Sequence, residues 1–256
     1  MPAILLPLRR IRIAVLLTVL PLTAYAAVGT GHAPSDSVHY RSCLSASNLN
    51  PASALTDAEA WEKVGGGVPA QHCAALALVN LKHYAEAAAR LDHVAADRGV
   101  PDMSFRIELY DQAGNAWLLA GDGAHAVQSF QAALALSAGD ADLFADLARA
   151  QAMRHDWHEV DLDLNAALQL SPHRADLLVL RASARRALEH YAEARSDIET
   201  ALKLKPGDSD ALVESGLLRK QLGDLGGARR DFQTALKTAT GETAAQAKEN
   251  LQALGP

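Results

Sequence analysis

The chain has 256 residues, which is enough for one or two ordinary domains or for one elongated array of repeats. Apolar residues make up 49% of it and aromatic residues only 5%. Because much of the apolar content is Ala, this composition favours helices that pack closely against one another. The formal net charge of -6 argues against a dominant nucleic-acid interface, which requires a basic surface.

The segment 1–26 has the features of a secretory signal peptide. Its positive flank consists of Arg9, Arg10 and Arg12. An apolar stretch at 13–22 follows, which is too short to cross a bilayer, and residues 24–26 (Ala-Tyr-Ala) match the small-x-small cleavage pattern. We therefore expect cleavage after Ala26 and export, most simply to a bacterial periplasm. The alternative is a retained membrane anchor, because the apolar Ile4–Leu8 stretch adds length.

Removal of residues 1–26 leaves 21 basic and 30 acidic residues and a formal charge of -9. The two cysteines, Cys43 and Cys73, would then lie in an oxidising compartment, where an even number of thiols favours one disulfide. Such a bond would restrict the unfolded chain, which is worth about 3–4 kcal/mol in the entropy model. The alternative is two separate thiols. Redox catalysis is not expected, because no Cys-x-x-Cys motif is present.

The segment before the first repeat shows little regular patterning. Residues 27–37 are rich in Gly, Ser and Pro, and we expect them to be disordered. Within 38–67, the capping-box pattern Thr56-x-x-Glu59 predicts one short helix to about Val64. The Gly-rich loop at 65–67 ends that helix.

A repeat with a constant period dominates the rest of the sequence. Four copies cover 107–242 without gaps and begin at Ile107, Ala141, Ala175 and Ser209. The most regular columns of the alignment hold Ala followed by Leu, as Ala133-Leu134, Ala167-Leu168, Ala201-Leu202 and Ala235-Leu236. Each copy contains two stretches with apolar residues at helical spacing, separated by a short turn, so we predict two helices per copy.

Weaker copies flank this array. Tyr84-Ala85-Glu86-Ala87 repeats the pattern of Tyr191-Ala192-Glu193-Ala194, which predicts a divergent copy at 68–106. A short insertion separates that copy from the next, and the loop Arg98–Ser104 accommodates it. At the other end, residues 243–256 predict a cap helix whose polar face protects the last repeat.

The repeat resembles the tetratricopeptide repeat (TPR) family. In the first copy the signature positions hold Tyr110, Ala113, Gly114, Trp117, Ala126, Phe130 and Ala133. The third copy departs most, because Arg181 and Arg185 occupy places that usually hold Leu and an aromatic residue. The resemblance implies an all-α fold, a right-handed superhelical solenoid of antiparallel helix pairs. It would have about five repeats plus a C-terminal cap helix.

The resemblance also implies a concave groove, lined by the first helix of each repeat, that binds a peptide or protein segment. The candidate groove residues are Asp111, Asn115, Asp146, Arg149, Met153, Val179, Arg186, Val213, Leu217 and Lys220. Several of them are apolar, and three form a basic line, so we expect apolar contacts guided by charge. Asp111 lies where the carboxylate-binding variant of the family needs a cation, which argues against that mode.

No catalytic, cofactor or metal site is predicted. His155 and His158 are close to Asp156 and Asp161 in the sequence, but an inter-helix turn is an ordinary place for such residues. The leading hypothesis is an exported, non-catalytic scaffold or adaptor for another protein or peptide of the cell envelope. It binds no nucleic acid and keeps no membrane span after cleavage. The alternative is a structural accessory subunit of an envelope enzyme or of a secretion or assembly complex, packing through its convex face. An enzyme on a repeat scaffold has the least support.

Overall fold

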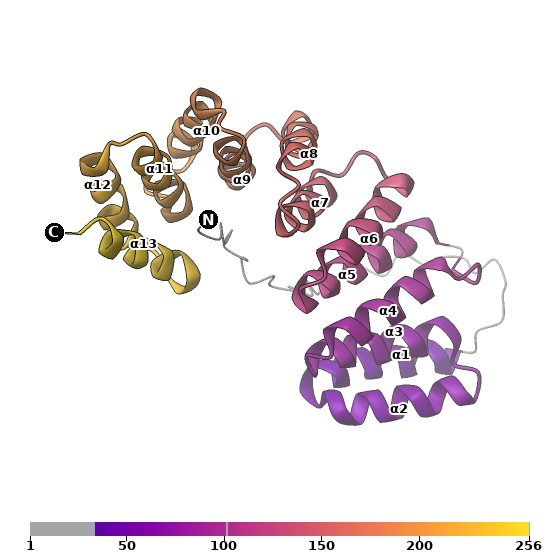
Figure 1. Cartoon of the computed structure of the whole chain (residues 1–256). Coiled ribbons are helices and arrows are strands. Elements are labelled where there is room, and N and C mark those ends of the chain that lie inside the picture. The colour runs from indigo at the N-terminus through magenta and orange to yellow at the C-terminus, as the bar shows by residue number, and fades with distance from the viewer. Residues whose placement is uncertain (1–33, 101, 256) are drawn as a thin grey trace. The chain divides into compact units, whose positions relative to one another are not determined.

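The computed structural model describes residues 34–100 and 102–255, and these residues form thirteen helices and no strand (Figure 1). They divide into two compact units, an N-terminal unit that ends at Ala120 and a C-terminal unit that begins at Gly121. The all-α helical-repeat fold predicted from the sequence is confirmed. The predicted signal peptide at 1–26 lies outside the described residues. Of the segment expected to be disordered, the last four residues begin the first helix, at Pro34.

The N-terminal unit contains five helices. They are α1 (Pro34–Leu49), α2 (Pro51–Lys63), α3 (Gly67–Asn80), α4 (Tyr84–Ala96) and α5 (Met103–Ala120). Consecutive helices pack against each other, and α1 also packs against α3. In this unit α1 and α3 are the first helices of successive pairs, and α5 is the first helix of the sequence repeat that begins at Ile107. We call the first helix of each pair or repeat an A helix and the second a B helix. The divergent repeat predicted at 68–106 corresponds to α3 and α4.

Two helices occupy the segment in which one short helix was predicted. α2 begins at Pro51, because Asn50 caps it by accepting a hydrogen bond from the Ser53 amide at 3.4 Å and Pro suits the first helical position. The prediction of a capping box at Thr56 is therefore wrong. Thr56 lies inside α2, where its hydroxyl donates to the Ala52 carbonyl at 3.1 Å.

The disulfide between Cys43 and Cys73 joins α1 to α3, with 6.1 Å between the two Cα atoms. Among the described side chains of α1, only Cys43 and Ser47 are buried, so this helix contributes little apolar surface to the core. The insertion before α5 is anchored at Val100, which is buried. The Arg106 guanidinium closes that loop by donating to the carbonyls of Asp97 at 2.9 Å and Val100 at 2.6 Å.

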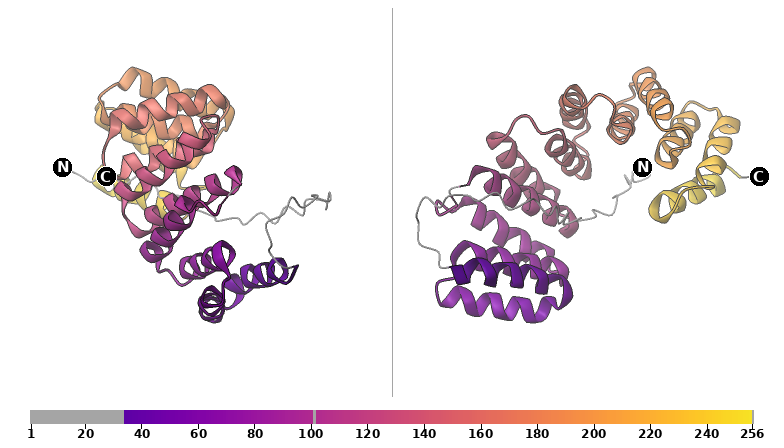
Figure 2. Two further views of the ribbon diagram at one scale, coloured as in Figure 1. Left: turned by 90° about the vertical axis from the view of Figure 1, so that its right-hand side faces the viewer. Right: turned by 180° about the vertical axis from the view of Figure 1, so that it is seen from behind.

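The C-terminal unit contains eight helices. They are α6 (Gly123–Leu136), α7 (Ala141–Met153), α8 (Trp157–Leu170), α9 (Ala175–Ala187), α10 (Tyr191–Leu204), α11 (Ser209–Gln221), α12 (Leu225–Ala235) and α13 (Gly241–Ala253). The pairs α7/α8, α9/α10 and α11/α12 follow one another, as Figure 2 shows from two sides, and α13 packs on α11 and α12. The A helices of this unit are α7, α9 and α11.

Small side chains allow these helices to approach closely. The alanines of the repeated column, Ala133, Ala167, Ala201 and Ala235, have no exposed surface. Gly216 on α11 shows how tight the contact is, because a Cβ atom placed there would lie 2.5 Å from the ring of Phe232 on α12. The constant spacing of the Ala column therefore reflects the need for a small side chain at the same helix contact in each repeat.

The turns within the pairs depend on one residue with left-handed backbone. That residue is Gly223 (φ 84°) between α11 and α12, but His155 (φ 62°) and Glu189 (φ 64°) take the same conformation in the two preceding repeats. Asp224 then caps α12 by accepting from the Gly227 amide at 2.8 Å. Asp156 does not cap α8 in this way and instead pairs with Arg154 at 3.0 Å.

The two arginines of the third copy form a polar network in place of an apolar contact. Arg181 donates to both carboxylate oxygens of Asp197, at 2.9 and 2.6 Å, and to Asn165 at 2.7 Å. Arg185 bridges Asp197 on α10 and Asp161 on α8, at 2.8 and 2.7 Å. Because each charge is matched, the network ties α9 to both neighbouring B helices.

A related contact recurs at the same position of each repeat. Asp163, Asp197 and Asp231 occupy equivalent positions of successive copies, and each accepts a hydrogen bond or ion pair from the A helix of its own pair. The donors are Gln151, Arg185 and Arg219, respectively. Only the first donor is uncharged, and burial raises the pKa of the Asp163 carboxyl beside it.

Replacing Asp197 tests how much this network contributes to the free energy of unfolding. We expect Asp197→Ala to lower the free energy of unfolding of the C-terminal unit by about 3 kcal/mol, because two arginines would lose their shared counter-charge in a poorly solvated place. Denaturant unfolding followed by circular dichroism measures the change. Glu199→Ala, on the exposed side of the same helix, is the control and should alter stability by less than about 0.5 kcal/mol. Equal effects of the two substitutions would contradict the prediction.

Candidate functional site

The candidate groove residues lie on A helices of both units. Asp111 and Asn115 belong to α5, and the other eight belong to α7, α9 and α11 of the C-terminal unit. The two groups are taken separately below. Whether these residues bind a partner is still a prediction, but the structure shows what each side chain contacts.

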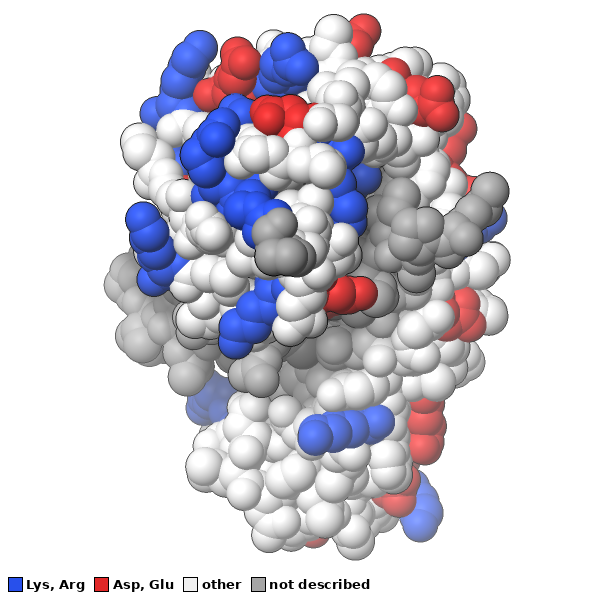
Figure 3. Space-filling model, turned by 60° about the vertical axis from the view of Figure 1, so that its left-hand side comes forward, with Lys and Arg blue, Asp and Glu red and all other residues white. Residues whose placement is uncertain are grey.

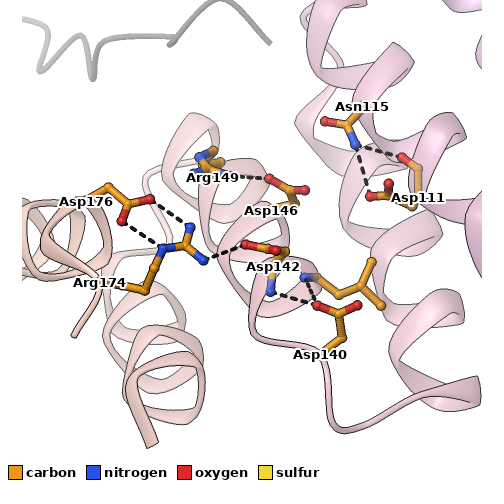
Figure 4. Close-up of polar contacts among 9 residues, drawn as sticks. Asp111, Asn115, Asp140, Asp142, Asp146, Arg149, Arg174 and Asp176 are labelled. Carbon is orange, nitrogen blue, oxygen red and sulfur yellow. Dashed lines mark hydrogen bonds and ion pairs between the residues drawn. The ribbon is translucent and has the colours of Figure 1, made fainter. Parts of the chain in front are cut away.

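On α5, the Asn115 side-chain amide is occupied within its own helix. It donates to the backbone carbonyl and to the carboxylate of Asp111, at 3.0 Å in each case (Figure 4). An amide held in this way is not oriented toward a ligand carboxylate. The geometry agrees with the sequence argument against the carboxylate-binding mode.

On α7, Arg149 forms an ion pair with Asp146 one turn before it, so both charges are satisfied locally (Figure 4). Met153, one further turn along, is half-buried. Of these three candidates, only Met153 presents an uncommitted, partly exposed side chain.

Arg174 is a site residue that the sequence reasoning missed. It precedes α9 and pairs with Asp142 of α7 and Asp176 of α9, at 2.8 Å each (Figure 4). The hydrogen bonds that Arg174 donates to Asp176, and then those to Asp142, raise the pKa of Arg174. The signal was present in the sequence, because Asp142, Asp176 and Asp210 recur once per repeat in the first turns of α7, α9 and α11.

Arg186 and Val213 do not lie on an open surface, so the expectation that they line a groove is wrong. Arg186 on α9 retains 6% of its surface and Val213 on α11 retains 3%. The Arg186 guanidinium forms an ion pair with Glu214 of α11, which is also buried. Helical spacing alone could not reveal that the next A helix supplies a counter-charge, Glu214, that covers Arg186.

Lys220 completes the proposed basic line, and it too has a partner. Its ammonium group donates to the Asn250 side chain on α13 at 3.0 Å, while the residue stays half-buried. Thr243 of α13 similarly donates to Asp210 of α11 at 2.6 Å. Polar contacts therefore join each A helix of the C-terminal unit to the next one or to α13.

The candidates that keep partly exposed apolar surface are Met153, Val179 and Leu217. Val179 packs at the edge of the core shared by α7, α8 and α9, and Leu217 at the edge of the core beside α13. Each is half-buried. They form the part of the predicted groove that can still gain burial by contact with a partner, and we call these three residues with Lys220 the A-helix face.

The N-terminal unit contains a hydrogen-bonded chain across its three A helices, which no sequence signal indicated. Tyr40 on α1 lies 2.5 Å from His72 Nδ1 on α3, and His72 Nε2 lies 2.8 Å from the Gln112 carbonyl oxygen on α5. Gln112 in turn donates to Glu108 at 2.9 Å. Because that carbonyl oxygen can only accept, His72 carries its proton on Nε2 and accepts from the Tyr40 hydroxyl.

Within 34–100 and 102–255, no group of three or more His, Cys, Asp or Glu side chains has the arrangement of a metal site. His155 and His158 are exposed at their turn, and the His155 ring lies 5.4 Å from that of Trp157. None of the described helices combines the length and apolar character required to cross a bilayer.

The paired helices, their repeat spacing and their stacked A helices define an all-α protein of the helical-repeat class. Residues 175–208, the third copy, match the family model of the tetratricopeptide repeat. Despite Arg181 and Arg185, this copy therefore keeps the family pattern. The chain therefore contains a tetratricopeptide repeat within its all-α helical-repeat fold.

Solved structures agree on the fold. A crystal structure of MamA has a TM-score of 0.55 at 17% sequence identity, covering 70% of this chain and 96% of that chain. MamA 41-end from Desulfovibrio magneticus RS-1 has a TM-score of 0.56 at 17% identity, with 70% and 93% covered. A search of curated protein sequences finds no match. At these identities the likeness concerns the fold.

The neutral, buried His72 predicts a pH dependence of stability. Burial lowers its pKa from 6.5, so the unfolded chain binds a proton more readily than the folded chain does. The free energy of unfolding is then highest above pH 6.5 and falls as the pH drops below that value, by up to about 1.4 kcal/mol per pH unit. Hydrogen exchange of peptides from α3, compared between pH 7.5 and about 5.5 after correction for the intrinsic exchange rate, measures the effect.

His72→Gln retains a donor and an acceptor without a titrating ring, and we expect it to remove most of this dependence. His83→Gln, at an exposed position, is the control and should leave the dependence intact. Glu108, whose pKa is raised by burial, acts in the opposite direction. A dependence that persists in His72→Gln would assign the effect to other groups.

Proposed function

We propose that this chain is an exported scaffold or adaptor that binds a peptide or protein segment on the A-helix face of its C-terminal unit, without catalysis. The observation that carries the proposal is that the charged and the apolar side chains of α7, α9 and α11 differ in what they contact. Most charged groups there are committed to contacts between helices, while Met153, Val179 and Leu217 keep apolar surface at the edges of the core.

The polar contacts between successive A helices support this proposal because they fix the spacing of the surface. Arg174 joins α7 to α9, Arg186 and Glu214 join α9 to α11, and Lys220 and Asn250 join α11 to α13. A surface that is rigid before binding loses less conformational entropy when a partner docks. Such a surface suits recognition of an extended or helical segment by apolar anchors at repeat spacing.

Substitution on the A-helix face tests the proposal. We expect the double variant Met153→Ser/Lys220→Ser to bind the partner at least about tenfold more weakly, because it loses an apolar anchor and a charge at two repeats. The partner is first captured from envelope extracts by the wild-type protein lacking the segment 1–26, and affinities are then measured with the purified partner.

A matched control separates loss of the face from general damage. Met103→Ser/Lys82→Ser removes the same two residue types from exposed positions in the N-terminal unit, and it should bind as the wild type does. Both variants should keep the wild-type helical circular dichroism. If the A-helix variant binds as tightly as the control, the partner uses another surface.

Export is supported by the N-terminal sequence and by the disulfide. A basic flank, an apolar stretch and a cleavage pattern occupy 1–26, and a Cys43–Cys73 bond is stable in an oxidising compartment. When the full chain is expressed in a bacterium, we expect the periplasmic product to begin at Ala27 and to contain no free thiol. N-terminal sequencing and intact mass before and after reduction measure both. A cytoplasmic product that still begins at the original N-terminus would refute export.

A further inference from the structure

Basic residues concentrate on the B helices of the last two repeats. We define the basic face as Arg195 and Lys203 on α10, Arg229 and Arg230 on α12, and Lys237 just after α12. Figure 3 looks at the side of the structure on which α12 and α13 lie, and Lys and Arg side chains gather over its upper part. The face lies on B helices, so it is distinct from the A-helix face.

The pattern repeats with the array. Arg195 and Arg229 are one full repeat apart, and so are Lys203 and Lys237. The third and fourth copies therefore carry a cation at the same two positions of the repeat. In the preceding repeat the same two positions hold Asp161 and Gln169. The basic character therefore begins at the third copy and is absent from the second.

The charges of the basic face are not consumed by ion pairs. None of its five residues is in an ion pair with a described residue, and all except Arg229 are exposed. The arginines of α9 differ in this respect, because Arg181, Arg185 and Arg186 are all paired. The acid of α12, Asp231, is held by Arg219 at 3.0 Å and by the Ser215 hydroxyl at 2.7 Å. Asp231 therefore forms no ion pair with Arg229 or Arg230.

We propose that the basic face binds an acidic segment of a partner protein. Two exposed leucines flank the turn before α12, Leu222 at the end of α11 and Leu225 at the start of α12, with 43% and 50% of their surface accessible. Leu225 is one helical turn before Arg229, so an apolar contact and a cation fall on the same side of α12. A segment that carries carboxylates next to an apolar residue complements this arrangement in both charge and shape.

An acidic peptide fits the basic face better than a nucleic acid or an anionic membrane surface does. On α10 the cations alternate with Glu193 and Glu199, both exposed, so this helix suits a ligand with separated carboxylates rather than a continuous row of anions such as a phosphate backbone. The whole chain also carries a net charge of -6, which opposes a large anionic polymer or membrane surface. The uncharged polar residues Gln233 and Thr234 can hydrogen-bond to a peptide between the cations.

Charge reversal tests the proposal. The probe is a fluorescent peptide in which single glutamates are separated by uncharged residues and leucines. We expect Arg230→Glu/Lys237→Glu to bind it at least about tenfold more weakly than the wild type in fluorescence anisotropy. Binding by the wild type should weaken when NaCl is raised from about 50 mM to about 0.5 M, because exposed charges are screened. Arg41→Glu/Lys82→Glu changes the net charge equally at exposed positions of the N-terminal unit and should bind as the wild type does.

Three outcomes would overturn the proposal. They are no measurable binding of the peptide by the wild type, an equal loss in the Arg41/Lys82 control, and tighter binding to phosphatidylglycerol vesicles or duplex DNA than to the peptide. The variant Met153→Ser/Lys220→Ser should retain peptide binding, since it leaves the basic face unchanged. Failure of the A-helix face and failure of the basic face are therefore distinguishable.

Discussion

Close contact between small side chains is the constraint on which the rest of this structure depends. Where Ala recurs once in every repeat without exposed surface, a small side chain lets one helix lie close against the next. Gly216 against the ring of Phe232 is the extreme case. This spacing brings long polar side chains of neighbouring helices within reach of one another. The ion pairs and hydrogen bonds of the A helices are therefore a consequence of the close packing rather than its cause.

The polar contacts have two different arrangements in the C-terminal unit. Within a pair, an A helix reaches the aspartate of its own B helix, as Arg185 reaches Asp197 and Arg219 reaches Asp231. Between pairs, A helices reach one another, as Arg186 reaches Glu214. The first kind fixes the geometry of one repeat, and the second fixes one repeat against the next. Met153 and the side chains of the basic face take part in neither kind of contact, and the two proposed binding surfaces are built on them.

The fold was readable from the sequence because its determinants are periodic. The Ala columns and the helix pairs of 107–242 need only spacing to be recognised, and the divergent copy at 68–106 shares enough of the pattern to be found. α1 was missed because it has little apolar periodicity and is joined to α3 by a disulfide. The start of α2 was misplaced because Thr56 and Glu59 imitate a capping box, while Asn50 and Pro51 provide the true beginning.

The candidate site was less predictable, since a face depends on which partners cover it. Helical spacing suggested one side of each A helix, but the burial of Arg186 depends on Glu214, which belongs to the following repeat. The Tyr40–His72–Gln112 chain joins three helices and follows no repeat column. Such contacts are specific to this chain, and a periodic pattern does not contain them.

The buried ion pair of Arg186 and Glu214 limits which single substitutions these two positions tolerate. Loss of either charge alone strands the other away from water, whereas a joint exchange for two apolar residues of similar volume removes the penalty. The effects of substitutions at the two positions on stability are thus coupled, and a substitution at one favours a compensating substitution at the other. The third and fourth copies, which contain Arg186 and Glu214 respectively, are therefore not independent of each other at these two positions.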